Sequence, residues 1–448
     1  MPTLKFKITP VTRGSKVKVL VVGGGGREHA LAWKLLESPQ VEQVYCVPGN
    51  GGTATLERCQ NIALSIEDFA GIAECVRSHD INFVVVGPEV PLALGITDYL
   101  QAQNIKVFGP NRAGAQIEAS KAWAKALMQQ AKIPTAKAAV FHEAKAAQDY
   151  VKAQGAPIVV KADGLAAGKG VTVAQTIEQA QDAIAAIFDG QFGSAGKFVV
   201  IEECLIGEEA SILALTDGVT IRALLPAQDH KRIGEGDTGE NTGGMGVYAP
   251  APVVTPALMA QVETQVLQSA IATLKNKGID YRGVLYAGLM IAPDGSFKVL
   301  EFNCRFGDPE TQAILPLLET PLADLLLACV EQRLSQMPLI AWKSGAAACV
   351  VVAAGGYPGA YEQGKIITGI DAAEALGANV FHAGTKLQSS LTPSIITAGG
   401  RVLGVTGTGA NFDQAIALAY DAVNQIHFEQ MYYRRDIGYR VKAKAVNF

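Results

Sequence analysis

The most restrictive feature of this sequence is the stretch 285–310, in which a turn separates two apolar runs and a charged loop follows. Residues 285–291 are apolar, residues 293–295 read Pro-Asp-Gly, and residues 297–302 are again largely apolar. Pro-Asp-Gly between two such runs is a strong turn signal. The pattern predicts a β-hairpin whose second arm leads into a segment rich in ion-binding side chains.

Two oxygen-bearing side chains, Glu301 and Asn303, lie on that second arm. Because strand side chains alternate between faces, both are expected on the same side, with Cα atoms roughly 6.5 Å apart. A carboxylate and an amide oxygen suit Mg²⁺, which binds few protein ligands and completes its shell with water and nucleotide phosphates. Arg305, Asp308 and Glu310 follow directly. The alternative is that Glu301 is a solvated strand residue and Arg305 a surface charge.

Length and charge narrow the class of protein. A chain of 448 residues is too long for one core, and its length predicts roughly three domains. Lys and Arg total 38 against 42 for Asp and Glu, so the chain offers no basic field and no nucleic-acid partner is expected. No apolar run reaches membrane-spanning length, so no membrane association is expected.

The cysteines and the amino terminus bear on the compartment. The seven cysteines are scattered, with no Cys-x-x-Cys pair. This argues against a disulfide framework or a zinc site and predicts a reducing compartment, the cytoplasm. Residues 1–15 lack the apolar centre and cleavage site of a secretory signal. Residues 1–13 carry basic and hydroxyl side chains without an acid, and a tag or an untidy terminus is favoured over organelle targeting.

The amino-terminal third begins as strand, glycine loop and helix. Residues 17–22 form a β-branched run, residues 23–29 read Gly-Gly-Gly-Gly-Arg-Glu-His, and residues 30–36 are good helix formers. Such a helix start binds anions through its free N–H groups and dipole. A dinucleotide fingerprint is rejected, because Glu28 replaces its third glycine and the second strand ends without an acid for the ribose.

A second strand end in this region also carries a polar side chain. A strand at residues 81–86 leads into Gly-Pro-Glu-Val-Pro at residues 87–91. Glu89 therefore stands at a carboxyl strand end, where open α/β sheets bind their ligands. Glu89 could instead cap a turn, but two polar strand ends favour a ligand crevice.

A nucleotide site is predicted in the middle of the chain. Residues 114–132 carry a helical apolar stripe, with Lys121 and Lys125 one turn apart on the same helix. The glycine-rich loop 162–170 lies between strands at residues 157–161 and 171–173. The loop is not a Walker A motif, because its glycine spacing differs and a strand follows instead of a helix. It resembles the mobile phosphate cover of kinase-like sites and is expected to fold over ATP.

The residues beyond the next strand extend this site. A strand at residues 198–201 leads into Glu-Glu-Cys-Leu-Ile-Gly-Glu-Glu at residues 202–209. Here adenine could meet backbone groups and a glutamate could hold ribose hydroxyls, although the segment alone is also compatible with a plain acidic loop. Residues 228–250 contain almost nothing that could be buried, which predicts a long binding loop without regular structure.

The carboxyl-terminal part has a different character. It begins near residue 345, and no obvious catalytic cluster is present in it. An apolar run at residues 349–354, several short strands and an amphipathic helix over residues 412–426 predict a small α+β unit.

Six short sequence motifs, taken in order along the chain, resemble those of the phosphoribosylamine-glycine ligases, which are ATP-grasp enzymes of purine biosynthesis. They occupy residues 25–30, 87–92, 161–170, 228–232, 241–246 and 301–312, and the last, Glu-Phe-Asn-Cys-Arg-Phe-Gly-Asp-Pro-Glu-Thr-Gln, is highly specific. The resemblance runs from residue 17 to about residue 440. Two features depart from the family pattern: the amino-terminal extension, and Cys204 where an aromatic residue is common.

The resemblance implies a multidomain α/β and α+β fold. An amino-terminal open parallel α/β domain is expected over residues 17–118, an ATP-grasp domain over 119–328 with a mobile lid at about 137–205, and a small α+β domain over 329–448. The implied reaction joins glycine to 5-phosphoribosylamine with ATP and Mg²⁺ or Mn²⁺. A monomer is the expected state, although the sequence does not determine the oligomeric state.

Patterns and resemblance together assign the candidate site. The expected catalytic residues are Arg305, Lys161 and Lys121, and the expected metal ligands are Glu301 and Asn303. The expected ATP-binding residues are Lys121, Lys161, Gly168, Lys169, Glu202, Glu203, Cys204, Leu205, Glu208 and Glu209. The expected substrate-binding residues are Gly25, Gly26, Arg27, Glu28, Glu89, Asp229, His230, Lys231, Arg232, Asn241, Thr242, Gly243, Gly244, Met245, Gly246, Arg305, Asp308 and Glu310. Arg305, a planar two-pronged donor, is assigned to the glycine carboxylate or its acyl phosphate.

Two other classes stay open. A different ATP-grasp ligase would keep the nucleotide half and lose the strings at residues 229–232 and 303–310. A non-catalytic nucleotide-binding module would need no metal ligands.

Overall fold

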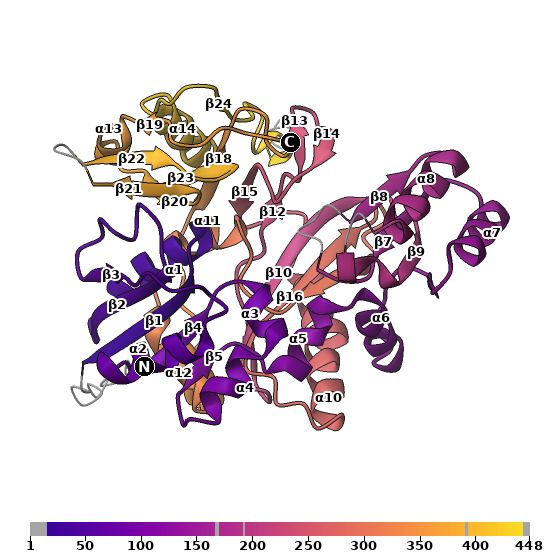
Figure 1. Ribbon diagram of the computed structural model, residues 1–448, viewed down its shortest axis with the longest axis horizontal. Helices are drawn as coiled ribbons and strands as arrows, with labels where there is room; N and C mark the ends of the chain where they lie inside the picture. The colour runs from indigo at the N-terminus through magenta and orange to yellow at the C-terminus, as the bar shows by residue number, and fades with distance from the viewer. Residues whose placement is uncertain (1–15, 166–169, 191–192, 390–392, 442–448) are drawn as a thin grey trace, which may run out of the picture.

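The computed structural model describes residues 16–165, 170–190, 193–389 and 393–441 (Figure 1). The amino-terminal part is a five-stranded parallel sheet of order β3-β2-β1-β4-β5. Its strands are β1 (Val17–Gly23), β2 (Val41–Pro48), β3 (Cys59–Asn61), β4 (Phe83–Val86) and β5 (Val107–Phe108), and its helices are α1 (Gly26–Leu36), α2 (Phe69–Ser78), α3 (Glu89–Leu94), α4 (Ile96–Gln101) and α5 (Arg112–Ala119). The predicted open parallel α/β arrangement is confirmed.

Both faces of this sheet are buried, as expected when helices cover both sides of a parallel sheet. Leu20 and Val22 of β1 lie in one core with residues of α2, whereas Val19 and Val21 lie in another with residues of α1. Helix α12 (Leu322–Val330) packs into the second core as well. The sheet is therefore held between helices from distant parts of the chain.

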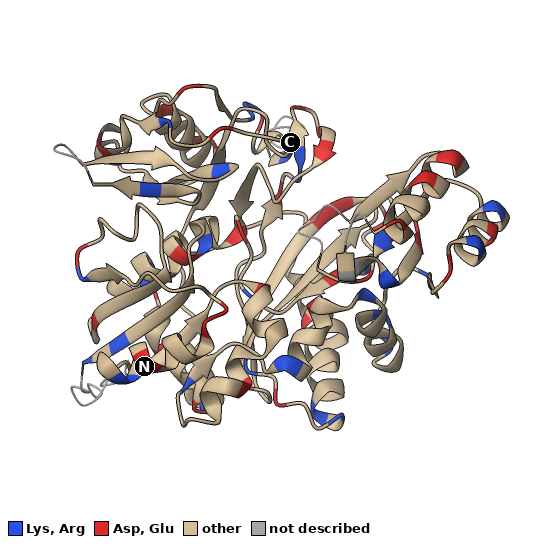
Figure 2. Cartoon of the chain, viewed as in Figure 1, with Lys and Arg blue, Asp and Glu red and all other residues tan. Residues whose placement is uncertain are grey.

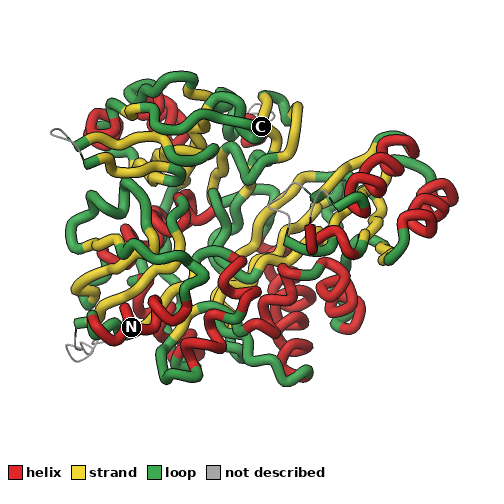
Figure 3. Tube along the Cα trace, in the orientation of Figure 1, coloured by secondary structure: helices red, strands yellow, loops and turns green. Residues whose placement is uncertain are grey.

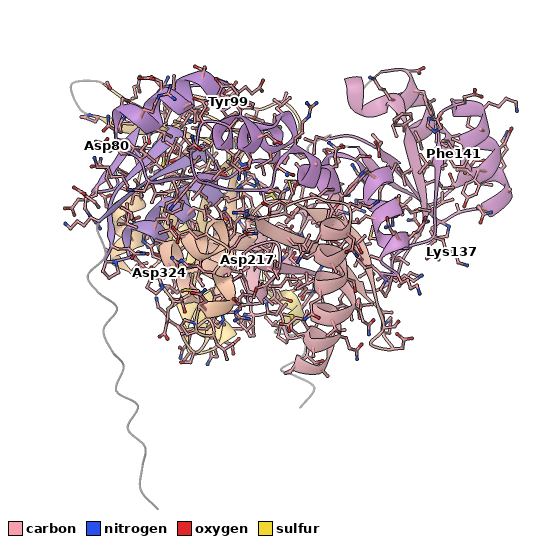
Figure 4. All side chains as sticks on the ribbon, turned by 90° about the horizontal axis from the view of Figure 1, so that it is seen from below. Asp80, Tyr99, Lys137, Phe141, Asp217 and Asp324 are labelled. Carbon is pink, nitrogen blue, oxygen red and sulfur yellow. The ribbon has the colours of Figure 1, made fainter. Side chains whose placement is uncertain are left out.

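A second unit projects from the rest of the molecule (Figure 1). It is an antiparallel sheet of order β6-β9-β7-β8, and it corresponds to the lid region defined above as residues 137–205. Its elements are β6 (Ala138–Phe141), α7 (Ala144–Gln154), β7 (Ile158–Ala162), β8 (Val171–Ala174), α8 (Ile177–Phe188) and β9 (Val199–Glu203). The two helices and the sheet enclose a core of their own, which explains why the unit can stand apart (Figures 3 and 4).

The central sheet has the order β11-β10-β16-β17 and is antiparallel. Its strands are β10 (Glu208–Thr216), β11 (Ile221–Ala223), β16 (Gly283–Ile291) and β17 (Phe297–Asn303), and α6 (Lys121–Gln130), α9 (Pro256–Val262) and α10 (Ser269–Asn276) accompany it. The predicted hairpin is confirmed as β16 and β17. Leu300 is an extra residue in this ladder, so Glu301 is turned away from the core that contains Val299.

The single helical stretch expected over residues 114–132 is wrong, because the chain forms two helices, α5 and α6. Ser120 lies between them with extended backbone, φ −138° and ψ 116°, and its side chain accepts the N–H of Trp123. A serine in this position is a favourable N-cap, so it starts a new helix.

The carboxyl-terminal sheet has the order β12-β15-β18-β23-β20, with β24 also paired to β18. These strands are β12 (Gln228–Asp229), β15 (Gly246–Ala249), β18 (Ala346–Ala354), β20 (Asn379–His382), β23 (Arg401–Gly409) and β24 (Met431–Tyr432). A small sheet of β19 (Ile366–Ile367), β22 (Ser394–Thr397) and β21 (Thr385–Gln388) lies nearby, with α13 (Ile370–Ala375) and α14 (Phe412–Val423). The predicted α+β character is confirmed.

The expectation of a structureless segment over residues 228–250 is wrong. The segment contains β12 and β15, and the hairpin of β13 (Arg232–Gly234) and β14 (Thr238–Asn241). Val247 and Tyr248 are fully or almost fully buried. The reason is that β15 pairs with β18, far along the chain, and this burial partner leaves no local signal in the sequence.

Three general properties complete the description. All seven cysteines are free. Within the residues that the structure describes, no helix combines the length and apolar character needed to cross a membrane. Positive and negative side chains are interspersed over the fold (Figure 2).

Candidate active site

The end of β17 is the centre of the candidate active site. Glu301 and Asn303 pair with Gly288 and Tyr286, two residues apart on β16, so the two side chains share a face of the sheet. Asn303 is buried, and 39% of the Glu301 side chain is exposed. Burial would raise the pKa of the Glu301 carboxyl, but nearby lysines, Lys231 foremost, outweigh it and hold the pKa below its ordinary value. Glu301 is thus a charged, accessible oxygen donor.

Arg305 lies next to these residues and is held by two carboxylates. Its Nη2 is 2.9 Å from Oε1 of Glu118, and its Nε is 3.2 Å from Oε2 of Glu89. Nη2 also donates to Oδ1 of Asn303 at 3.3 Å. Burial raises the pKa of Glu118, whereas for Glu89 the positive charges of Arg305 and Arg27 outweigh burial and lower the pKa.

A buried glutamate holds two lysines of the nucleotide side, which is the part of the site formed by residues 121–209. Oε2 of Glu202 is 2.9 Å from Nζ of Lys161, and Oε1 is 3.1 Å from Nζ of Lys125. Only 3% of the Glu202 side chain is exposed, so its carboxylate orients the lysines, and its predicted contact with ATP stays a prediction. Glu203 instead pairs with Lys298 at 2.5 Å, which joins the lid region to β17.

The start of the glycine-rich loop is tied to the start of α6. Asp163 accepts the hydroxyl of Ser120 at 3.0 Å and the N–H of Ala122 at 2.7 Å. Lys121, the first residue of α6, donates through Nζ to the carbonyl of Gly164 at 3.1 Å. Burial lowers the pKa of Lys121, and the negative charge of Glu301 opposes that shift. Lys121 therefore lies within the electrostatic field of the β17 strand end.

The remaining ATP-binding predictions concern the loop and the segment after β9. Gly168 and Lys169 lie outside the described residues. Cys204 and Leu205 follow β9 directly and are partly exposed. Glu208 opens β10 and accepts the side-chain amide of Gln228 at 3.4 Å. Their contacts with a nucleotide stay predictions.

Lys231 links the nucleotide side, through Glu209, to the end of β17, through Glu301. Its Nζ is 2.8 Å from Oε2 of Glu209 and 4.0 Å from Oε1 of Glu301. Burial would lower the pKa of Lys231, but these two carboxylates outweigh it and raise the pKa well above its ordinary value. Lys231 therefore remains charged beside Glu301.

The glycine loop before α1 is stabilised by its own glutamate. Glu28 is 2% exposed, accepts the N–H of Gly25 at 2.6 Å and pairs with Nε of Arg27 at 2.5 Å. Arg27 also donates to the carbonyl of Phe306 at 3.1 Å. The Glu28 carboxylate thus shapes the loop from inside, while Gly26 begins α1.

The carboxyl-terminal sheet supports the same loop from outside. Asn50 donates through Nδ2 to the carbonyl of Gly24 at 3.1 Å and to that of His382 at 2.7 Å. The N–H of His382 donates to Nδ1 of His29 at 2.8 Å. A Cβ on Gly24 would lie 2.6 Å from the carbonyl oxygen of Gly49, so only glycine fits this close approach.

Asp308 lies over the glycine loop and is anchored by an arginine from β23. A Cβ on Gly25 would lie 3.4 Å from Oδ2 of Asp308, and the same oxygen is 3.1 Å from Nη2 of Arg401. Nη1 of Arg401 donates to the carbonyl of Gly243 at 2.5 Å. Three segments that are distant in sequence therefore meet at Asp308.

Asp229 and Glu310 lie close to each other in the same part of the site. Gly244 has a φ of +110°, and a Cβ there would lie 2.8 Å from Oδ1 of Asp229. Burial, reinforced by Glu310, raises the pKa of Asp229 well above its ordinary value. Glu310 is 3% exposed and accepts hydrogen bonds from Ser211 at 2.9 Å and Tyr286 at 2.6 Å. These hydrogen bonds are internal to the fold, and the predicted substrate contact of Glu310 stays a prediction.

Two other predicted substrate-binding residues, His230 and Met245, have buried side chains, and their predicted contacts with substrate stay predictions. His230 is completely buried, its Nδ1 donates to the carbonyl of Gly246 at 3.2 Å, and its Nε2 accepts the N–H of Gly438 at 3.2 Å. Burial, with Arg440 nearby, lowers the pKa of His230 to about 3. Met245 is also completely buried. The His230 ring and the backbone carbonyl of Met245, which accepts the N–H of Val351, anchor the segment to the carboxyl-terminal part.

The rest of this segment is held by its own hairpin. Arg232 pairs with Asn241 across β13 and β14 and donates to the carbonyl of Gly239 at 2.6 Å. Thr242 donates through its hydroxyl to the carbonyl of Lys231 at 2.8 Å. Their predicted contacts with substrate stay predictions.

Four residues of the site were missed by sequence reasoning: Glu118, Asp163, Gln312 and Arg401. Asp163 and Gln312 lie inside the diagnostic strings, so their position was a usable signal. Nε2 of Gln312 donates to Asp308 at 2.8 Å, while its buried Oε1 lacks a partner among the described residues. Glu118 and Arg401 stand outside any motif and are recognisable only from their contacts.

Comparisons with known proteins agree with this arrangement. The models of the phosphoribosylglycinamide synthetase N domain, ATP-grasp (A) domain and C domain match residues 17–118, 119–311 and 347–440. A phosphoribosylamine-glycine ligase of Nostoc sp. is 74% identical over 427 residues, covering 95% of this chain and 100% of the relative.

Solved structures give the same result. The crystal structure of phosphoribosylamine-glycine ligase from Thermotoga maritima matches with a TM-score of 0.81 at 33% identity, covering 94% of this chain and 100% of that one. A biotin carboxylase domain of the Hydrogenobacter thermophilus 2-oxoglutarate carboxylase matches with a TM-score of 0.69 at 14% identity, covering 94% of this chain and 92% of that one, which shows a shared fold alone.

The fold is thus of the ATP-grasp class. The chain belongs to the phosphoribosylamine-glycine ligase family, as the three domain models and the 74% identity establish.

Proposed function

We propose that this chain joins glycine to 5-phosphoribosylamine, giving glycinamide ribonucleotide, ADP and phosphate, in de novo purine biosynthesis. ATP first phosphorylates the glycine carboxylate, and the amine of phosphoribosylamine then displaces phosphate from the glycyl phosphate. One observation carries the proposal: the β17 strand end, with Glu301, Asn303 and Arg305, lies between the lysines of the nucleotide side and the loops of the substrate side.

The donor set at Glu301 and Asn303 fits a hard divalent cation. Both offer oxygen from one face of β17, and Glu301 is charged and partly exposed. Among the described residues, no cluster of three or more histidine, cysteine, aspartate or glutamate side chains could hold a metal ion. Two protein oxygens suit a cation that completes its shell with water and phosphates. When bound, Mg²⁺ or Mn²⁺ would neutralise charge on the transferring phosphoryl group.

Lysines of the nucleotide side bind the phosphates in this proposal. Glu202 holds Lys161 in place, and the contact of Lys121 with the Gly164 carbonyl places it at the root of the glycine-rich loop. Fixed positive charges of this kind stabilise the negative charge of phosphoryl transfer without reorganising during the reaction.

Arg305 orients glycine in this proposal. Its guanidinium donates charge-assisted hydrogen bonds to the glycine carboxylate, which fixes the oxygen to be phosphorylated. Fixing this geometry lowers the barrier, because reacting atoms must approach to roughly 3–3.5 Å.

Phosphoribosylamine binds between the glycine loop and Asp308. The start of α1 offers N–H groups to its phosphate, as helix starts do for anions. Arg401 anchors Asp308 and the Gly243 carbonyl around this place. The substrate amine is itself the nucleophile, so the chain needs no nucleophilic side chain. A cytoplasmic location is proposed with this role.

ADP release tests the proposal. A coupled assay on the purified chain should show ADP formation only when glycine, phosphoribosylamine, ATP and Mg²⁺ are all present. ADP release with another acid or amine in place of either substrate would favour a different ATP-grasp ligase. Nucleotide binding without any turnover would favour a binding module.

A further inference from the structure

Glu118 is a buried carboxylate that the proposed reaction does not use. It lies in the last turn of α5, and 8% of its side chain is exposed. Oε2 accepts the backbone N–H of Cys304 at 2.8 Å, and Oε1 lies 2.9 Å from Nη2 of Arg305. One side chain therefore fixes both a main-chain amide and a guanidinium directly after β17.

Glu118 is the closest and most buried carboxylate on Arg305. The contact of Glu89 with Nε is 3.2 Å, and 26% of the Glu89 side chain is exposed. Charge-assisted hydrogen bonds gain strength where water is excluded, so the Glu118 contact is the firmer anchor. The Nη2 atom that Glu118 holds also donates to Oδ1 of Asn303, so Glu118 controls the position of two functional side chains together.

The charge balance also assigns different roles to the carboxylates of Glu118 and Glu89. Two negative charges face one guanidinium at Nε and Nη2, so a substrate carboxylate that binds Arg305 at either nitrogen has to replace one of them. Glu89 is the more exposed partner and makes the longer contact. Glu118 is additionally tied to the main chain at Cys304 and is therefore the one that stays.

We propose that Glu118 is a positioning residue: it holds Arg305 and Asn303 in register for glycine and metal, while Glu89 is the partner that the glycine carboxylate displaces. This inference rests on the proposed function, because Arg305 is assigned to glycine there. Glu118 itself touches neither substrate.

Glu118→Gln tests this role because it keeps the size of the side chain and removes its charge. We expect kcat/KM for glycine to fall about 10- to 100-fold, as for loss of a residue that orients a ligand. The KM for ATP should stay within about twofold of the wild type and the melting temperature close to it. Glu331→Gln is the matched control: Glu331 pairs with Lys106 and Arg333, each at 2.7 Å, outside the site, and its loss should change neither constant.

A double-mutant cycle separates positioning from general stability. If Glu118 acts through Arg305, adding Glu118→Gln to Arg305→Lys should reduce kcat/KM for glycine by less than about threefold, because interacting residues are not additive. Losses that multiply would overturn the proposal, as would equal rises of the KM for glycine and for ATP. If Glu118→Gln does not fold, Glu118→Asp, which keeps the charge but cannot reach both partners, takes its place in the cycle.

Calorimetric titration with glycine distinguishes failure of this inference from failure of the proposed function. If the wild type binds glycine and Glu118→Gln binds it with an affinity lower by about tenfold or more, both the proposed function and the role of Glu118 are supported. Binding that is unchanged in the variant overturns the role of Glu118 alone. No glycine binding and no glycine-dependent ADP release by the wild type would overturn both.

Discussion

The nucleotide side of the site draws most of its charged side chains from one continuous stretch, residues 121–209, whereas the substrate side is assembled from four distant segments. Lys121, Lys161 and Glu202 lie in and around the lid region. The substrate side combines residues 25–28, residues 229–244, Asp308 and Arg401.

Because of this difference, the nucleotide side depends on local structure, whereas the substrate side depends on contacts between distant segments. The nucleotide side is organised by neighbouring strands and one buried glutamate, so its geometry follows from local structure. The substrate side depends on the carboxyl-terminal sheet at two places: Asn50 joins the Gly24 carbonyl to that of His382, and Arg401 binds Asp308 and the Gly243 carbonyl. Changes to the carboxyl-terminal sheet should therefore affect one substrate and spare ATP.

The largest effect is expected where the two halves meet. Glu301→Gln removes the charge that faces lysines from both sides, and kcat should fall about 10²-fold or more while the fold persists, as when a transition-state stabiliser is lost. Steady-state kinetics at saturating substrates measure this. Wild-type turnover in Glu301→Gln would mean that the strand end is not the centre of the chemistry.

Arg401→Gln should sharpen the comparison by acting on the substrate side alone. It removes charged hydrogen bonds to Asp308 and to the Gly243 carbonyl. Losing such bonds costs about 1.5–3 kcal/mol, so kcat/KM for phosphoribosylamine should fall about 10- to 100-fold.

The KM for ATP should not change in Arg401→Gln. Lys365→Gln is the control, because Lys365 forms its ion pairs with Glu362 and Glu429 elsewhere in the carboxyl-terminal part. An equal rise of the KM for ATP would show that the two halves are not separable.

Arg305→Lys should have a smaller effect, confined to glycine. The change keeps the charge and loses the planar fork, so the KM for glycine should rise about tenfold and the KM for ATP less. Initial rates with each substrate varied in turn measure this. Parallel increases in both constants would place Arg305 on the nucleotide side.

The smallest predicted effect is on stability at mildly acidic pH. Burial lowers the pKa of His382 to about 4, whereas in the unfolded chain the residue titrates near 6.5. Below pH 6.5 the unfolded chain therefore binds a proton that the folded chain does not, and stability falls as the pH falls towards 4.

Between pH 7 and 5.5 this histidine should cost about 1 kcal/mol, visible as a lower melting temperature. His382→Asn should reduce that dependence. His142→Asn, in an exposed position of the lid region, should leave it as in the wild type. Identical pH dependence in all three proteins would contradict a buried neutral histidine at the docking interface.

The sequence predicts the nucleotide side better than the substrate side, for a physical reason. The hairpin of β16 and β17 follows from two apolar runs and one turn, which are local signals. The strand β7 also follows from a short apolar run. Each of these elements lies within a few residues of where the pattern places it.

The rest depends on long-range partners. Residues 228–250 look unburiable until β15 pairs with β18, and only the folded chain shows that Gly438 and Gly246 occupy the ring nitrogens of His230. Arg401 and Glu118 carry no motif, because their roles come from Asp308 and Arg305 in the folded chain.

The fate of one oxygen tests the central claim, that ATP activates the glycine carboxylate. If glycine becomes an acyl phosphate, one carboxylate oxygen must leave with the phosphoryl group, because the amine attacks carbon. Glycine labelled with ¹⁸O in its carboxylate should therefore yield inorganic phosphate that carries one label per turnover, as mass spectrometry would show. Unlabelled phosphate from labelled glycine, with glycinamide ribonucleotide still formed, would contradict the account.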